Sequence, residues 1–227
     1  MRTDFRNLED QGPPGVLRWP TDRAREWTRR LVDSAHTTPS ILAIVAIGSA
    51  VRPNVDSADL DLIAIRDDTR AVDRTAPLEI DLRVYPMAEV TSQISSGHDM
   101  LGWAVKFGRV LFQRDHYWDQ LVNAWQDRLP LPSPAVARER AARAHRRLAK
   151  VLESGDVDAS LEQALSYLTH LARAELLNRS IYPASRPELP SQLRAIGSFQ
   201  IAEWLDGLLQ NKLPELTEID RLLKVPA

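Results

Sequence analysis

The sequence of 227 residues contains no cysteine, which excludes disulfide bonds, zinc sites built from thiolates and a cysteine nucleophile. Long hydrophobic runs are also missing, because no apolar stretch approaches the roughly 18 residues that a membrane-spanning helix needs. The first six residues, Met1 to Arg6, have no apolar core, so we expect no signal peptide. Together these absences predict a cytoplasmic protein that does not enter a membrane.

An excess of charge of one sign is missing too. The chain has 29 Lys and Arg against 31 Asp and Glu, a net charge of −2, so no overall positive field favours nucleic acid. Only a local patch could supply basic character. One segment is rich in arginine, namely Arg138, Arg140, Arg143, Arg146 and Arg147. We expect a solvated helix face there; the alternative is a patch for an acidic partner, RNA or nucleotide phosphates.

What is present is typical of a globular protein, with 44% hydrophobic and 26% charged residues. The length allows one large domain or two small ones. Residues 130–134 contain three prolines, which prevent a helix and extend the chain. After them the composition shifts to Ala, Leu, Arg and Glu with helical periodicity. We therefore predict an α/β domain at 1–129, a linker at 130–134 and a helical domain at 135–227. Residues 1–20, rich in Pro and Gly near their middle, are predicted to form a loose arm.

Hydrophobic periodicity and cap residues predict the individual elements. Thr21 and Asp22 can cap a helix that runs to about Ser34. Strands are predicted at 41–47, 59–65, 78–85 and 110–112. Helices are predicted at 86–94, 101–107, 117–128, 135–153, 159–178, 191–211 and 215–223.

Acidic residues interrupt two of the predicted strands. Asp59 and Asp61 are two residues apart, so in a strand they share a face at a distance of about 6–7 Å. The strand that follows alternates, with Asp81 on its polar side. If the two strands are neighbours, three carboxylates meet, and these are the hard oxygen ligands that Mg²⁺ prefers. The alternative is that Asp81 only pairs with Arg83 on an exposed strand face.

The order of these residues resembles the nucleotidyltransferase superfamily of the DNA polymerase β type. An apolar strand ends at Gly-Ser, a spacer of nine residues follows, then Asp-x-Asp inside an apolar strand, and later a single Asp. The small aminoglycoside-type and toxin/antitoxin-type members are the most similar. The resemblance covers residues 41–85 and extends more loosely to 115. It implies an α/β (α+β) fold with a small mixed sheet and flanking helices, followed by a helical bundle domain.

The resemblance also implies roles for the acidic residues. Asp59 and Asp61 would bridge two Mg²⁺ ions, with Mn²⁺ as an alternative, and Asp81 would complete the site nearer the acceptor. Asp81 would also take the proton of the acceptor hydroxyl. All three would therefore be metal ligands and catalytic residues.

Residues around the end of the first strand would bind the nucleotide. Gly48 lets the backbone approach a phosphate closely because it has no Cβ. Ser49 and Arg52 would bind the β- and γ-phosphates, Arg52 through a charge-assisted hydrogen bond. The sequence departs from the family's pattern at Ala58, where many members have Ser, and at Pro53, where Gly is common. Both departures affect the geometry of the loop and leave the carboxylates in place.

The resemblance implies transfer of a nucleoside monophosphate to a hydroxyl acceptor with release of pyrophosphate. We expect AMP from ATP; the alternative is the corresponding monophosphate from another NTP. We expect a small-molecule acceptor bound by the helical half, because the chain is short and not basic. One alternative is a macromolecular acceptor, either a tRNA end or a side chain of a partner protein. The other is a nucleotide-binding module without catalysis, against which the three intact carboxylates argue.

Overall fold

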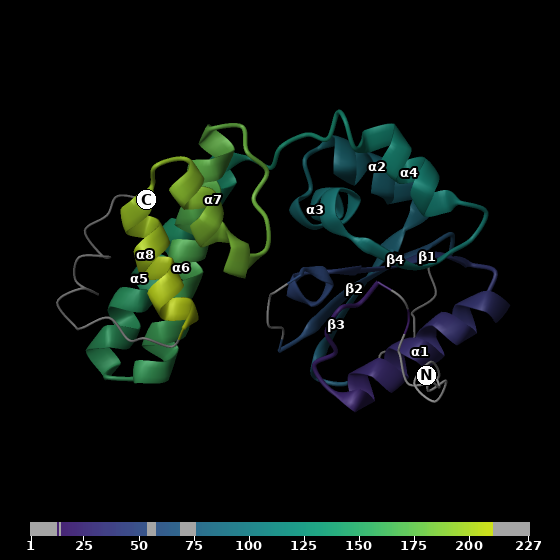
Figure 1. Cartoon of the computed structure of the whole chain (residues 1–227), viewed down its shortest axis with the longest axis horizontal. Helices are drawn as coiled ribbons and strands as arrows, with labels where there is room; N and C mark the ends of the chain where they lie inside the picture. The colour runs from purple at the N-terminus through teal and green to yellow at the C-terminus, as the bar shows by residue number, and fades with distance from the viewer. Residues whose placement is uncertain (1–12, 14, 54–57, 69–75, 211–227) are drawn as a thin grey trace, which may run out of the picture. The chain divides into compact units, whose positions relative to one another are not determined.

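The computed structural model describes residues 13, 15–53, 58–68 and 76–210. The chain divides into two compact units, Met1–Pro130 and Leu131–Ala227. The first unit combines helices with a four-stranded mixed sheet, and the second is helical (Figure 1). The predicted fold class is therefore confirmed. Within the described residues, no helix is long and apolar enough to cross a membrane.

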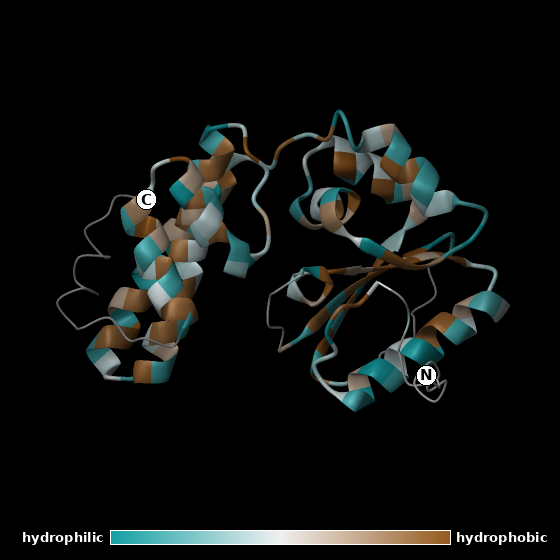
Figure 2. Ribbon diagram, in the orientation of Figure 1, coloured by the Kyte–Doolittle hydropathy of each residue, from teal (hydrophilic) through white to brown (hydrophobic). Residues whose placement is uncertain are grey.

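The sheet has the strand order β3-β2-β1-β4. Its strands are β1 (Ile41–Ile47), β2 (Leu60–Arg66), β3 (Ile80–Pro86) and β4 (Arg109–Gln113). Strand β1 runs antiparallel to β2 and β4, whereas β2 and β3 are parallel. The two central strands read as nearly continuous hydrophobic runs because both of their faces are buried, and Figure 2 shows the same hydrophobic strands.

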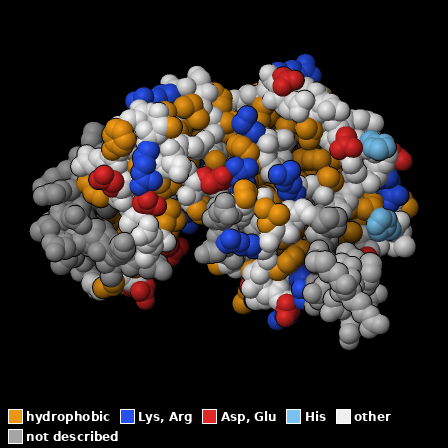
Figure 3. Space-filling view, in the orientation of Figure 1, with side chains coloured by type: hydrophobic (Ala, Val, Ile, Leu, Met, Phe, Trp, Pro, Cys, Tyr) orange, Lys and Arg blue, Asp and Glu red, His pale blue; other side chains and the backbone are white. Residues whose placement is uncertain are grey.

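Charged residues remain at the surface of both units. On the face shown in Figure 3, acidic and basic side chains both appear, as the near-zero net charge would suggest. On helix α5 (Pro134–Ser154), Arg138 donates a hydrogen bond to Asn178 at 3.0 Å and Arg143 lies 3.8 Å from Glu139. These two arginines therefore have local partners within the helical unit.

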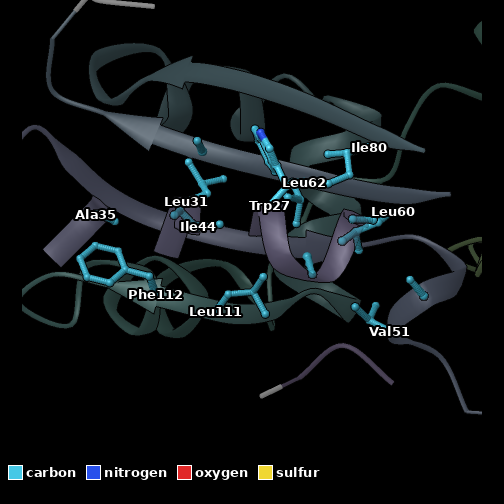
Figure 4. Packing of buried hydrophobic residues seen from close by; sticks show 14 of the residues in the cluster. Trp27, Leu31, Ala35, Ile44, Val51, Leu60, Leu62, Ile80, Leu111 and Phe112 are labelled. Carbon is cyan, nitrogen blue, oxygen red and sulfur yellow. The ribbon is translucent and has the colours of Figure 1, made fainter. Parts of the chain in front are cut away.

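Helix α1 (Asp22–Thr37) covers one face of the sheet. Trp27, Leu31 and Ala35 recur every four residues and are buried among strand residues such as Ile44 and Leu62 (Figure 4). The predicted N-cap is confirmed, since the Thr21 side chain accepts a hydrogen bond from the Ala24 N–H at 3.1 Å.

The opposite face of the sheet is covered by α2 (Met87–Ser95), α3 (Asp99–Phe107) and α4 (Tyr117–Trp125) (Figure 1). Strand residues Val45, Ile63 and Ile65 pack there against Val90 of α2 and Leu101 of α3. The sheet is thus sandwiched between helices, and the central strands β1 and β2 are buried along nearly their whole length.

Residues 15–20 differ from the predicted loose arm. The Leu17 N–H donates a hydrogen bond to the Ala50 carbonyl at 2.9 Å, and Val16 and Trp19 pack against the α1 side of the sheet. Two large apolar side chains thus fix a segment whose Pro and Gly content suggested a loose chain. Residues 1–12 and 14 of the predicted arm lie outside the described residues.

The second unit is built from α5, α6 (Val157–Asn178), α7 (Leu189–Ala195) and α8 (Phe199–Leu209). Leu148, Tyr167, Leu168 and Leu205 are among the residues of its buried cluster. Pro134, predicted to belong to the linker, is instead the first residue of α5, where its missing N–H and fixed φ are tolerated.

The single helix predicted at 191–211 is wrong. Helix α7 ends near Gly197, which has φ +81°, and the Ser198 N–H donates to the Leu193 carbonyl at 2.9 Å. This left-handed residue turns the chain so that α8 begins as a separate helix. The helix predicted at 215–223 lies outside the described residues.

Candidate functional site

The predicted site residues lie along one edge of the sheet. There β1 ends, while its antiparallel neighbours β2 and β4 begin. Strand β3 also begins at this edge, because it is parallel to β2. In register, Ile47 at the end of β1 faces Asp61, Asp61 faces Asp81, and Ala46 faces Arg109. The end of β1 and the starts of β2, β3 and β4 therefore lie at this edge.

Asp61 occupies the side of β2 that otherwise carries Ile63 and Ile65, beneath helices α2 to α4. Its position at the start of the strand leaves the carboxylate half-buried, whereas Ile63 and Ile65 are fully buried. Asp59 is exposed and precedes β2, which begins at Leu60 and ends at Arg66, one residue later at each end than predicted.

Asp81 is the direct neighbour of Asp61 in the parallel pair of β2 and β3. The start of this pair is fixed by a hydrogen bond of 2.7 Å from the Leu60 N–H to the Glu79 carbonyl. Because paired residues of neighbouring strands point to the same side, the carboxylates of Asp61 and Asp81 emerge on one face of the sheet.

Gly48 directly follows β1 and lies next to the carboxylate of Asp61. Its backbone has φ +79° and ψ −157°, a conformation that is essentially restricted to glycine. A Cβ atom at this position would lie 2.5 Å from Oδ2 of Asp61. The bare backbone of Gly48 thus leaves the space that the Asp61 carboxylate fills, a contact the sequence does not reveal.

Ser49 and Arg52 continue the chain beyond Gly48. Ser49 opens the short 3₁₀ turn η2 (Ser49–Val51), and its carbonyl accepts a hydrogen bond from the Arg52 N–H at 3.0 Å. The Arg52 guanidinium lies over the ring of Phe107, with Cζ 4.9 Å from the ring centroid. Nζ of Lys106 is 5.8 Å from the same centroid.

No sequence pattern predicted that Phe107 and Lys106 would lie at this site. Neither belongs to a motif, and both are more than 50 residues from Arg52 in the chain. Only the packing of α3 against the sheet brings them to Arg52. A Phe that ends a predicted helix carries no signal of such a contact.

Arg83 is the ion-pair partner of Asp81. Its Nη2 and Nε atoms lie 2.8 Å and 3.2 Å from Oδ2 of Asp81, and the two side chains are 52% and 49% exposed. The hydrogen bond to Asp81 raises the pKa of Arg83, partial burial lowers it, and the charges of Asp81 and Asp61 raise it. Arg83 thus acts as the counter-ion of this acidic edge.

The donor chemistry of this edge fits a hard divalent cation. Mg²⁺ is commonly bound by one or two carboxylates together with substrate phosphates and water, which Asp59 and Asp61 can provide. Within the described part of the chain, however, no three acidic or histidine side chains are grouped as ligands of one ion. Both hydrogen bonds from Arg83 go to Oδ2 of Asp81, so Arg83 competes with a cation for this carboxylate.

An open pocket of about 630 Å³ lies beside the start of β4 and helix α4. Its lining includes Arg109, Trp118, Asp119 and Asn123. The volume is in the range of small-molecule pockets. Its lining contains none of the predicted site residues. Strand β1 lies between β4 and the two strands that carry Asp61 and Asp81.

Comparisons with known proteins give a similarity of fold only. No protein-family model matches the sequence, and no curated protein matches it. Among solved structures, the chain is similar to a nucleotidyltransferase-like protein from Exiguobacterium sibiricum, with 17% sequence identity and a TM-score of 0.41. The match covers 88% of this chain and 74% of that chain. Such a distant likeness does not bear on function, which has to be argued from the site residues.

Proposed function

We propose that this protein is a metal-dependent nucleotidyltransferase that moves AMP from ATP to the hydroxyl group of a small molecule and releases pyrophosphate. The observation that carries the proposal is the register of the sheet edge. There, Asp61 lies between Asp81 on β3 and the end of β1, with its carboxylate against the backbone of Gly48. An acidic side chain at a half-buried strand position, with space kept for it by glycine, favours a functional group over a structural one.

Asp59 and Asp61 would hold Mg²⁺ or Mn²⁺ at the reacting phosphate, and Asp81 would take part on the acceptor side. When bound, the cation supplies charge stabilisation at the reacting phosphate and at the leaving pyrophosphate. Without a cation between them, the carboxylates would repel a triphosphate. We therefore expect nucleotide binding to depend on divalent metal.

The places of Ser49, Arg52 and Asp81 at this sheet edge support the remaining proposed roles. Ser49 and Arg52, just beyond β1, would donate hydrogen bonds to the phosphates, with the bond from Arg52 charge-assisted. Asp81 would accept the proton of the acceptor hydroxyl. The acceptor oxygen then forms a bond to the α-phosphorus, the bond from this phosphorus to the β-phosphate oxygen breaks, and pyrophosphate leaves. We further propose that the helical unit contributes to acceptor binding.

The ion pair of Asp81 with Arg83 favours a second candidate, a nucleotide-binding module without catalysis. In that case Asp81 would be a neutralised strand residue, and the described residues would keep only two acidic side chains for a cation. A half-exposed ion pair contributes at most about 1 kcal/mol, so a divalent cation could compete with Arg83 for Asp81. For this reason the catalytic candidate comes first.

The test is incubation of the protein with each α-labelled NTP, Mg²⁺ and a cell extract. We expect label from ATP in the small-molecule fraction, with pyrophosphate released in equal amount. Label in RNA or in protein would identify a macromolecular acceptor instead. Nucleotide binding without pyrophosphate release would support the non-catalytic module.

Calorimetry supplies the matched control for the metal site. Asp59→Asn and Asp61→Asn should each weaken Mg²⁺-ATP binding, whereas Asp67→Asn should not, because this exposed carboxylate follows the far end of β2. EDTA should weaken binding by the parent protein. Equal ATP affinity with and without Mg²⁺ would contradict the metal site.

A further inference from the structure

Two basic side chains from separate segments meet at one aromatic ring. The Arg52 guanidinium follows β1, and Lys106 lies in the last turn of α3, yet both approach the ring of Phe107, at 4.9 Å and 5.8 Å from its centroid. On α3 the Trp103 ring lies 4.9 Å from that of Phe107, which limits the movement of Phe107. These residues form a basic and aromatic cluster that the motif does not include.

The fold holds this cluster beside the end of β1. Phe107 is followed by Gly108, where a Cβ would lie only 2.5 Å from the Ala104 carbonyl oxygen and 2.8 Å from Cγ1 of Val45. Helix α3 can therefore pack this closely against β1 only because Gly108 has no side chain. Arg109 then pairs with Ala46, so Phe107 is held at the same sheet edge as Gly48 and Asp61.

Helix geometry alone does not explain the cluster. A lysine in the last turn of a helix is favoured by the partial negative charge there, which accounts for Lys106. The charge at the helix end does not account for Arg52, which lies outside the helix and contacts the same ring. A cation near an exposed aromatic face gains about 0.5–1 kcal/mol, so the Phe107 ring favours the presence of both side chains at this place.

Charge is ordered along this edge of the sheet. The starts of β2 and β3 carry the acidic residues Asp61 and Asp81, whereas Arg52 and Lys106 lie at the end of β1 and before the start of β4. A nucleoside triphosphate needs a cation at its reacting phosphate and positive groups along its terminal phosphates. Along this edge, the acidic residues that would hold the cation come first and the basic side chains that would bind the terminal phosphates come next. This is the order of the groups along one extended triphosphate.

We propose that Arg52 and Lys106 bind the β- and γ-phosphates of the nucleotide and that Phe107 is the positioning residue that holds the two cations there. The assignment of the ligand rests on the proposed nucleotidyl transfer. It adds two residues, Lys106 and Phe107, to the binding site, and it predicts that the cluster recognises the polyphosphate tail rather than the nucleoside.

The experiment compares three probes by calorimetry in the presence of Mg²⁺, namely inorganic tripolyphosphate, ATP and AMP. Lys106→Ala should weaken tripolyphosphate and ATP about tenfold, as for loss of one charged contact, and should leave AMP unchanged. Phe107→Leu should weaken the same two probes about three- to fivefold. Phe107→Tyr keeps the ring and should restore parental affinity, and Lys150→Ala, an exposed lysine of the helical unit, is the control.

A positioning role has a further signature. If Phe107 acts by holding Arg52, then the double variant Arg52→Ala with Phe107→Leu should lose less affinity than the two single variants together. Additive losses would mean that Phe107 only stabilises the fold. Lys106 is exposed, so Lys106→Ala tests the site even if Phe107→Leu is poorly folded.

The outcomes separate this inference from the proposed function. Parental polyphosphate affinity in Lys106→Ala, an equal loss of AMP binding, or no polyphosphate binding by the parent protein would each overturn the inference. If AMP transfer proceeds while Lys106→Ala binds ATP normally, the function stands and the inference fails. If the variants weaken tripolyphosphate as expected but no nucleotide is ever transferred, the inference stands and the proposed reaction fails.

Discussion

At the scale of single residues, Arg83 offsets part of the negative charge of the acidic edge. Asp61 and Asp81 are direct cross-strand neighbours, an arrangement of like charges that weakens strand pairing. Arg83 offsets this repulsion through its ion pair with Asp81. Since a half-exposed pair adds little stability, we interpret Arg83 as a group that reduces the negative charge of the site until a divalent cation is bound.

Asp81→Asn should separate nucleotide binding from chemistry. Asparagine keeps the shape of the side chain but cannot take a proton, so Mg²⁺-ATP should bind within a few-fold of the parent. Transfer should fall by a factor on the order of 10² or more, as for loss of a general base. The measurement is single-turnover pyrophosphate release at saturating ATP with the acceptor present. Near-parental turnover would rule out this role for Asp81.

Arg83→Ala should increase the affinity of the site for a divalent cation. The substitution removes the competitor for Asp81, so Mn²⁺ should bind about two- to fivefold more tightly, while stability falls by less than about 1 kcal/mol. Calorimetric titration with Mn²⁺ and a thermal melt measure the two effects. Arg29→Ala is the matched control, because Arg29 forms a comparably exposed ion pair with Glu26 on α1. An unchanged Mn²⁺ affinity in Arg83→Ala would show that Arg83 does not compete for Asp81.

At the scale of elements, the turn from β1 into η2 determines where the Asp61 carboxylate lies. Glycine is required at position 48 for two reasons, its backbone conformation and the nearby carboxylate.

Gly48→Ala is expected to lower both stability and Mg²⁺-ATP binding. The stability loss should be on the order of 1–3 kcal/mol, because φ +79° with ψ −157° strongly disfavours a side chain. Gly155→Ala at the end of α5 is the control, since it also has positive φ but nothing within 4 Å of a new Cβ. It should cost about 1 kcal/mol and leave nucleotide binding unchanged. Chemical denaturation and calorimetry measure the two effects, and equal ATP affinity in Gly48→Ala and the parent would contradict the role of this contact.

At the scale of the whole molecule, each unit has hydrophobic clusters of its own. Those of the first unit lie on the two faces of the sheet, and the larger cluster of the second joins α5 to α8. Because each unit has such a core, we propose that they are separate domains joined near the proline-rich segment.

Limited proteolysis should first cleave the chain between residues 129 and 133, where no helix or strand protects the backbone. Mass spectrometry would identify two resistant fragments, and we expect each to melt cooperatively. First cleavage inside α5 or the sheet would contradict a domain boundary at this place.

The sequence by itself determined the features that depend on neighbouring residues. An apolar run of seven residues predicted β1, Thr21 predicted the start of α1, and alternation placed Asp81 on the polar side of its strand. These predictions succeed because strand alternation, helix capping and turn chemistry act over a few residues. The same local signals overlooked the glycine turn at 197, since one glycine within a helical pattern does not reveal its φ.

Only the tertiary structure decided which distant groups meet. The register of β2 with β3 made Asp61 and Asp81 neighbours, and the packing of α3 on β1 brought Phe107 to Arg52. It also fixed residues 15–20 against Ala50, although their composition suggested a loose arm. Such contacts depend on the sum of many packing interactions across the sheet, and no single stretch of sequence contains that sum.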